Sequence, residues 1–223
     1  MFRKILLSAV LIAASTAANA GPVIFSEGFD SRSALNASNW LFGNFSDPAA
    51  TLAGDDWFQG NTGIFSSQSG AADSYVANNF LSAEFGGNID TWMVTPLIAA
   101  SNGGGVITFS TRTAGDNPFG GDNLEVLFSN TGSLNTNDYV SLGTIGSASY
   151  PTDWTTFNFL YESTAANVRF AFRYTVTDTS TFGDYIGIDS LSVAVPEPGT
   201  MMLLGAGLLL MPLAMRRRRR HQS

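Results

Sequence analysis

The sequence predicts an all-β domain, a jelly-roll β-sandwich, flanked by an N-terminal signal peptide and a C-terminal transmembrane helix. Three observations support this. The central part has neither heptads nor a long amphipathic helical pattern. Its short runs of β-branched and aromatic residues alternate with Gly, Asn, Asp and Ser clusters, and both ends have the composition of processing segments. We therefore divide the chain into residues 1–20, 21–195 and 196–223.

The first 20 residues match a secretory signal peptide. Arg3 and Lys4 supply a positive start, an apolar run follows from Ile5 to Ala14, and Ala18-Asn19-Ala20 forms a small-x-small cleavage site. An apolar run of about ten residues is too short to span a bilayer, which favours a cleaved signal over a membrane anchor. We expect cleavage after Ala20 and export of the domain that begins at Gly21.

Eight segments of the exported domain have the composition of strands. In residues 167–176, large apolar side chains at even positions alternate with Arg169, Ala171, Arg173 and Thr175, so we expect the even positions to face the core. Strands joined by Gly-rich turns suit two packed antiparallel sheets. The expected strands are Val23–Phe29, Tyr75–Phe85, Thr91–Ile98, Val106–Arg112, Leu124–Phe128, Trp154–Tyr161, Asn167–Val176 and Tyr185–Val193.

The region from Leu35 to Gly70 is less regular, and we expect a long excursion that covers one edge of the sandwich. Trp40 and Trp57 within it could form an aromatic platform on which sugar rings stack their apolar faces. The competing interpretation is that both tryptophans close the end of the sandwich core.

The exported part is strongly acidic. Outside the two ends only Arg32, Arg112, Arg169 and Arg173 remain against 18 acidic residues, a formal charge of about −14. Such a surface repels nucleic acid and anionic lipid and attracts divalent cations or basic partners. We therefore expect no nucleic-acid partner.

Several residue types that catalysis uses are missing. The chain has no cysteine and a single histidine, His221, which lies beyond the terminal arginines. This excludes Ser-His-Asp triads, Cys-His dyads and His- or Cys-ligated zinc from the exported domain. A glycoside hydrolase that needs only two carboxyl groups stays chemically possible. We nevertheless predict a non-catalytic protein, because among 18 acidic residues a pair of carboxylates is no signal by itself.

The C-terminal tail combines an apolar segment with a basic cluster. Sixteen uncharged, mostly apolar residues run from Thr200 to Met215, and five arginines come after them: Arg216, Arg217, Arg218, Arg219 and Arg220. As a helix this segment would reach about 24 Å, short for a stable membrane span but tolerable in a transient one. The positive-inside rule keeps the arginines cytoplasmic, in agreement with export of the preceding domain. The alternative is a membrane anchor that is never cut.

Together with Pro196, Glu197 and Pro198, this tail resembles the PEP-CTERM sorting signal. The resemblance implies recognition by an exosortase-type membrane protease of bacteria that usually also make exopolysaccharide. It also implies a transient inner-membrane-anchored precursor and a final place at the cell surface or in the extracellular matrix.

The exported domain is itself similar to a family. The segments "FSEGFDS", "NIDTWMVTPLI", "GDNLEVLFSNTG", "DWTTFNFLY" and "YIGIDSLSV" follow one another as in choice-of-anchor J domains, relatives of the cleaved-adhesin and MAM-like jelly rolls. The resemblance implies a non-catalytic protein, adhesive or structural in biofilm or exopolysaccharide. The alternatives are a carbohydrate-binding module for exopolysaccharide, with Trp40 and Trp57 as stacking residues, and a glycoside hydrolase that uses two carboxylates.

Calcium is the cofactor that the resemblance suggests. Similar jelly rolls often hold a structural calcium between the first and last strands, where this chain has Glu27 and Asp189, and Asp90 could join them. The alternative is that Glu27 and Asp189 accept backbone hydrogen bonds at strand ends. Asp116, Asp122 and Glu125 form a looser second set, for which a solvated turn is the preferred interpretation.

Overall fold

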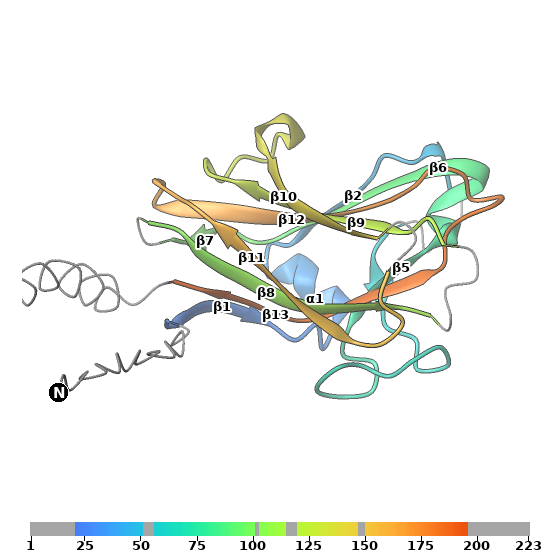
Figure 1. Cartoon of the computed structure of the whole chain (residues 1–223), viewed down its shortest axis with the longest axis horizontal. Helices are drawn as coiled ribbons and strands as arrows, with labels where there is room; N and C mark the ends of the chain where they lie inside the picture. The colour runs from blue at the N-terminus through green and yellow to red at the C-terminus, as the bar shows by residue number, and fades with distance from the viewer. Residues whose placement is uncertain (1–20, 51–55, 101–102, 115–119, 147–149, 196–223) are drawn as a thin grey trace, which may run out of the picture.

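The computed structural model describes residues 21–50, 56–100, 103–114, 120–146 and 150–195. Two antiparallel sheets, one of six strands and one of seven, pack face to face with little helix (Figure 1). The predicted all-β jelly-roll sandwich is confirmed. Four predicted features lie outside the described residues: the signal peptide, the PEP motif, the apolar segment and the arginine cluster. Among the residues that the structure describes, no helix is long and apolar enough to cross a membrane.

The six-stranded sheet has the order β11-β8-β13-β5-β4, with β1 paired to β13. Its strands are β1 (Val23–Glu27), β4 (Phe58–Gln59), β5 (Val76–Asn79), β8 (Gly105–Thr113), β11 (Thr155–Tyr161) and β13 (Tyr185–Ala194).

The seven-stranded sheet has the order β10-β9-β12-β6-β2, with β3 paired to β6 and β7 paired to β12. Its strands are β2 (Leu41–Asn44), β3 (Asp47–Ala49), β6 (Ala83–Val94), β7 (Ile98–Ala99), β9 (Asn123–Ser129), β10 (Val140–Gly146) and β12 (Asn167–Val176). The helical elements are α1 (Arg32–Ala37) and the 3₁₀ turns η1 (Phe80–Ser82) and η2 (Thr136–Asp138).

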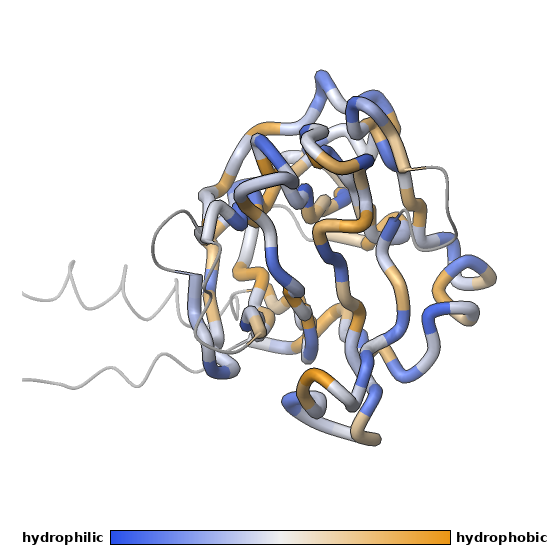
Figure 2. Tube along the Cα trace, turned by 90° about the vertical axis from the view of Figure 1, so that its right-hand side faces the viewer, coloured by the Kyte–Doolittle hydropathy of each residue, from blue (hydrophilic) through white to orange (hydrophobic). Residues whose placement is uncertain are grey.

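The core lies between the sheets, and β12 shows how the sequence positions it. The side chains at its even positions, Val168, Phe170, Phe172, Tyr174 and Val176, are all buried, as the alternation predicts. Phe172 meets Phe109 of the opposite sheet edge-on, with 4.9 Å between ring centroids. Hydrophobic and hydrophilic residues alternate along the chain trace (Figure 2). The odd positions of β12 therefore belong to the outer face of the seven-stranded sheet.

One predicted strand, Tyr75–Phe85, is wrong in its extent. The chain leaves β5 through η1 and enters β6 in the other sheet. The Asn79 side chain caps this turn by accepting a 2.9 Å hydrogen bond from the Leu81 N–H. β6 then continues without a break to Val94 and includes the start of the predicted strand Thr91–Ile98. The glycines at 86 and 87 do not end this strand, whose first half pairs with β3.

Both ends of the described domain lie side by side. The Val195 N–H donates to the Pro22 carbonyl at 3.2 Å, and β1 pairs with the last strand, β13. In Figure 1 the chain enters and leaves at the same end of the sandwich, opposite the turn between β5 and β6.

Candidate functional site

The best candidate site is a groove on the outer face of the seven-stranded sheet. We call it the outer groove and define it by Phe45, Asp90, Trp92, Glu125, Tyr139 and Arg173; its volume is about 500 Å³. The strand register builds it, since Arg173 on β12 lies opposite Trp92 on β6 and opposite Glu125 on β9. All three side chains point outward, because their neighbours along each strand face the core.

Arg173 is the centre of the groove. Its Nε and Nη2 donate to the two carboxylate oxygens of Asp90, both at 2.7 Å, and its Nη1 lies 3.5 Å from Glu125 Oε2. The Trp92 indole N–H donates to the same Asp90 carboxylate at 2.8 Å. The hydrogen bond to Asp90 is the largest of the effects that raise the pKa of Arg173, so the guanidinium keeps its charge. The groove thus presents one fixed cation between two carboxylates, all partly open to solvent.

Aromatic rings form the sides of this polar centre. Trp92 is nearly buried and meets Tyr139 edge-on at 6.1 Å between ring centroids, and the Tyr139 hydroxyl donates to the Ser133 carbonyl. Phe45 is 63% exposed. A side chain at Gly43, which lies opposite Trp92, would come within 3.0 Å of the Phe45 ring, so glycine leaves room for the ring at this rim of the groove.

The two tryptophans named as possible sugar-stacking residues lie in the core. Trp40 is 2% exposed and packs on Phe29, while Trp57 is fully buried and packs edge-on against Tyr174. Neither offers a ring face to solvent, because both belong to the buried core cluster. The interpretation that they close the core agrees with this placement.

Two of the three carboxylates proposed as calcium ligands lie on strands that pair with each other, β1 and β13. Glu27 on β1 lies opposite Leu191, next to the bulge at Asp189 and Ser190 on β13. Asp189 is buried; one of its oxygens accepts from the N–H groups of Gln68 and Ser69 at 2.7 and 3.0 Å, and the other from the Ser190 N–H.

Glu27 accepts from the Phe29 N–H at 2.9 Å. Asp90 does not belong to this set. It faces outward from the opposite sheet and is bound to Arg173. No group of three or more carboxylates or histidines arranged to hold a metal ion occurs among the described residues, and calcium at Glu27 and Asp189 stays a prediction.

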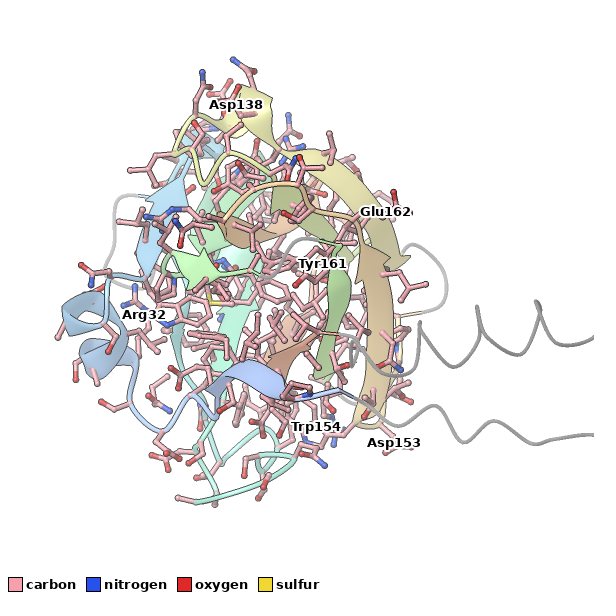
Figure 3. All side chains as sticks on the ribbon, turned by 90° about the vertical axis from the view of Figure 1, so that its left-hand side faces the viewer. Arg32, Asp138, Asp153, Trp154, Tyr161 and Glu162 are labelled. Carbon is pink, nitrogen blue, oxygen red and sulfur yellow. The ribbon has the colours of Figure 1, made fainter. Side chains whose placement is uncertain are left out.

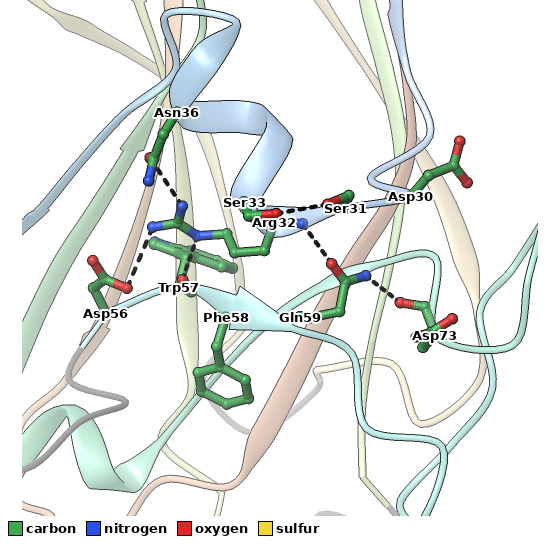
Figure 4. Close-up of a pocket in the computed structure, with 10 residues that line it drawn as sticks. All are labelled: Asp30, Ser31, Arg32, Ser33, Asn36, Asp56, Trp57, Phe58, Gln59 and Asp73. Atoms are coloured by element: carbon green, nitrogen blue, oxygen red, sulfur yellow. Dashed lines mark hydrogen bonds and ion pairs between the residues drawn. The ribbon is translucent and has the colours of Figure 1, made fainter.

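A second pocket of about 660 Å³ lies beside helix α1 (Figure 4). The cationic side chain that lines it, Arg32, donates to the Trp57 carbonyl at 2.6 Å and to Asn36 at 3.0 Å, and it contacts Asp56 at 3.5 Å. Its guanidinium also lies over the Phe42 ring at 3.3 Å from the centroid. Arg32 is thus occupied in holding β4 to α1, which makes this pocket a weaker candidate than the outer groove.

Asp122 differs from the solvated turn expected for it. It is fully buried directly before β9, where one carboxylate oxygen accepts from the Tyr174 hydroxyl and the Asp184 N–H. The other oxygen has no hydrogen-bond partner. Burial raises its pKa to about 6. Because solvent does not reach it, we assign Asp122 to the architecture and not to ligand binding.

Comparison with known protein families identifies the motif in the C-terminal tail. Residues 194–219 match the model of the PEP-CTERM protein-sorting motif. The chain carries a PEP-CTERM sorting signal. It is therefore an exported cell-surface protein, and the signal implies processing by an exosortase-type membrane protein. A search of curated proteins gave no match.

The domain is similar in fold to cleaved adhesin domains of Lys-gingipain. For the K3 domain from Porphyromonas gingivalis W83 the TM-score is 0.54 at 20% identity, over 78% of this chain and 98% of the other. For the K1 domain from the same strain the TM-score is 0.53 at 16% identity, over 79% of this chain and 100% of the other. For the K2 domain the TM-score is 0.52 at 15% identity, over 76% of this chain and 98% of the other. These likenesses agree with the choice-of-anchor J resemblance.

Most of the outer groove leaves no signal in the sequence. The alternation in β12 places Arg173 on the outer face, but nothing local indicates that Trp92 and Glu125 stand on either side of it. The usable signal was "NIDTWMV", in which Asp90 and Trp92 share one face of a strand. Phe45 gave no local signal that distinguishes it from the buried aromatic residues around it.

Proposed function

We propose that the exported domain is a non-catalytic adhesive module that binds extracellular polysaccharide in the outer groove. The observation that carries this proposal is the bidentate Arg173–Asp90 pair beside the exposed Phe45 ring. Sugars combine vicinal hydroxyls with an apolar C–H face, so they suit a site with a few fixed polar groups and an aromatic wall. Arg173, Asp90 and Glu125 supply donors and acceptors, and Phe45 supplies the wall.

Several observations support a binding role over hydrolysis. A glycoside hydrolase needs one carboxylic acid that can protonate the leaving oxygen. Both carboxylates of the outer groove contact the Arg173 guanidinium, so each is engaged with a cation of the domain itself. The sorting signal and the adhesin-type fold point the same way. A purely structural role in the matrix is the second candidate; it predicts no glycan binding at all.

Glycan binding by the purified exported protein tests the proposal. An array that includes acidic and neutral bacterial polysaccharides should show binding, and Phe45→Ala should weaken it about 3- to 10-fold, as expected for one stacked ring. Arg173→Lys keeps the charge but loses the bidentate geometry, so it should weaken binding as well.

Phe85→Ala is the matched control. Phe85 is also a solvent-exposed phenylalanine of the same domain, 86% exposed, but it lies outside the outer groove. Its loss should leave binding unchanged. Wild-type protein that binds no glycan above background would favour the structural role, and equal losses for Phe45→Ala and Phe85→Ala would remove the groove from the proposal.

A further inference from the structure

Strand β11 is an open edge of the six-stranded sheet. Within the described part of the chain it pairs with β8 alone, over seven consecutive residues and without a register shift. Its sequence, TTFNFLY, contains no charge, proline or glycine. Leu160 on this strand is 82% exposed. Figure 3 shows the strand along one side of the molecule, with Asp153 and Glu162 at its two ends. A long, regular, uncharged edge of this kind is a template for another strand.

The other terminal strands of the two sheets are short or interrupted. At the far end of the same sheet β4 has two residues, and in the other sheet β2 has four. β10 is as long as β11, but a register shift between Ser141 and Gly143 breaks its ladder, and Gly143 has a positive φ. Short strands and bulges are the devices with which proteins protect edges from unwanted pairing. β11 has neither, and among the described residues Asp153 and Glu162 place a carboxylate at each end of it.

We propose that β11 pairs with β11 of a second copy of this chain, antiparallel and with the two-fold axis at Asn158. The strand is self-complementary in this register. Phe157 would lie opposite Phe159 of the partner subunit, and Thr156 would lie opposite Leu160 of the partner subunit. Phe157 and Phe159 already pack beside Phe109, with ring centroids 6.4 and 6.1 Å away. The pairing would extend this aromatic row across the axis, and aromatic cross-strand pairs stabilise sheets.

The flanking charges select the antiparallel arrangement. A parallel in-register pair would set Asp153 against Asp153 of the partner subunit, and it would repeat this repulsion at Glu162. Like charges directly opposite each other destabilise a sheet. Around Asn158 the antiparallel pair instead sets Asp153 opposite Ser163 of the partner subunit and Glu162 opposite Trp154 of the partner subunit. The remaining repulsion between two acidic domains is screened by salt, so self-association should strengthen as ionic strength rises.

A single engineered thiol tests the axis, because the chain has no cysteine. In an antiparallel pair, directly opposed Cα atoms are about 4.5–5.5 Å apart, within the range that a disulfide bridges. Asn158→Cys in the exported protein should therefore form a disulfide-linked dimer under mild oxidation, visible on a non-reducing gel. Salt at about 0.5 M should increase the dimer band.

Thr156→Cys is the matched control. Thr156 and Asn158 share a face of β11, and each loses one side-chain hydrogen bond to β8 on substitution. Two copies of residue 156 would be separated by about four residues, or about 13 Å, which no disulfide spans. We expect at least ten times more dimer for Asn158→Cys than for Thr156→Cys. Equal crosslinking at both positions, no crosslinking at either, or a product with a different polypeptide would overturn the proposal.

A second variant separates pairing from folding. Leu160→Glu in the Asn158→Cys background adds a like charge to the edge but removes no buried contact, because Leu160 is largely exposed. It should abolish the crosslink while leaving the melting temperature within about 2 °C, since surface changes of this kind cost under about 0.5 kcal/mol. Undiminished crosslinking in this variant would show that β11 is not the contact. Phe45→Ala should not affect crosslinking, so the β11 pairing and the glycan binding in the outer groove are tested independently of each other.

Discussion

The buried carboxylate of Asp122 predicts a specific pH dependence of stability. Its pKa is raised to about 6, chiefly by burial and against the hydrogen bonds that it accepts from Asp184 and Tyr174. A carboxyl group with a raised pKa in the folded state favours folding below its ordinary pKa of 3.8. That contribution is lost as the pH rises through about 6. Ionisation of Asp122 therefore destabilises the fold at neutral pH.

The magnitude follows from the shift. With the pKa of Asp122 raised from 3.8 to about 6, its ionisation lowers the free energy of unfolding by about 3 kcal/mol at pH 7.5. At pH 4 the same relation gives a loss of under about 1 kcal/mol. Asp122→Asn removes the titration but keeps an oxygen that accepts from the Tyr174 hydroxyl. Its new amide N–H groups lack a partner, a cost that is the same at both pH values. The difference in melting temperature between variant and wild type should therefore move in favour of the variant by about 5–10 °C between pH 4 and pH 7.5.

Circular dichroism melts of both proteins across this pH range measure the effect. Asp153→Asn serves as the control, because it makes the same change of side chain at a solvent-exposed aspartate of the same domain. A melting-temperature difference between Asp122→Asn and wild type that is the same at pH 4 and pH 7.5 would contradict this expectation. That result would show that burial does not raise the pKa of Asp122, and the reasoning would be refuted.

Two further predictions concern the last strand and the tail. Asp189→Ala removes the acceptor of three backbone N–H groups and should lower the melting temperature by about 6–12 °C, or about 3 kcal/mol, in chelator as well as in calcium. If Glu27 and Asp189 also hold calcium, the wild type should gain about 5–10 °C at calcium 100 times its dissociation constant, and magnesium should substitute poorly; identical melts in calcium and chelator would contradict that. Changing Pro196, Glu197 and Pro198 to alanine should leave the protein in the membrane with its C-terminus intact; mass spectrometry of wild-type surface protein that finds a C-terminus at Ser223 would rule out processing.

The fold could be predicted where its signal is local. The period-two pattern of residues 167–176 fixed both the extent of β12 and the face that it buries. The pattern failed at η1, where a capped turn moves the chain from one sheet to the other within a run of strand-forming residues. It also missed β10, whose segment "VSLGTIG" pairs with β9 despite two glycines. Pairing with a neighbour, and not intrinsic propensity, decides such segments.

The candidate site could be predicted only in part, because it depends on register. Asp90 and Arg173 are 83 residues apart, and their ion pair exists only because β6 and β12 align as they do. Composition alone could not separate the exposed Phe45 from the buried Trp40, since both come from the same aromatic-rich region. Whether such a side chain is exposed depends on the path that the chain takes around the edge of the sheet. A short irregular segment has no periodic sequence pattern from which that path could be predicted.

The position of the chain ends gives the outer groove and the β11 edge a common setting. Pro22 and Val195 are hydrogen-bonded at one end of the sandwich, and the sorting signal starts there. Attachment through that end would leave uncovered both the β11 edge (Figure 3) and the outer face of the sheet that contains β9 and β12 (Figure 1). Copies confined to a surface layer meet at a higher effective concentration than free copies. An edge contact too weak to be populated in dilute solution should therefore form at the cell surface, so the Asn158→Cys crosslink is expected to be stronger on intact cells than in the released protein at equal amounts. The reverse order would mean that attachment holds the β11 edges apart.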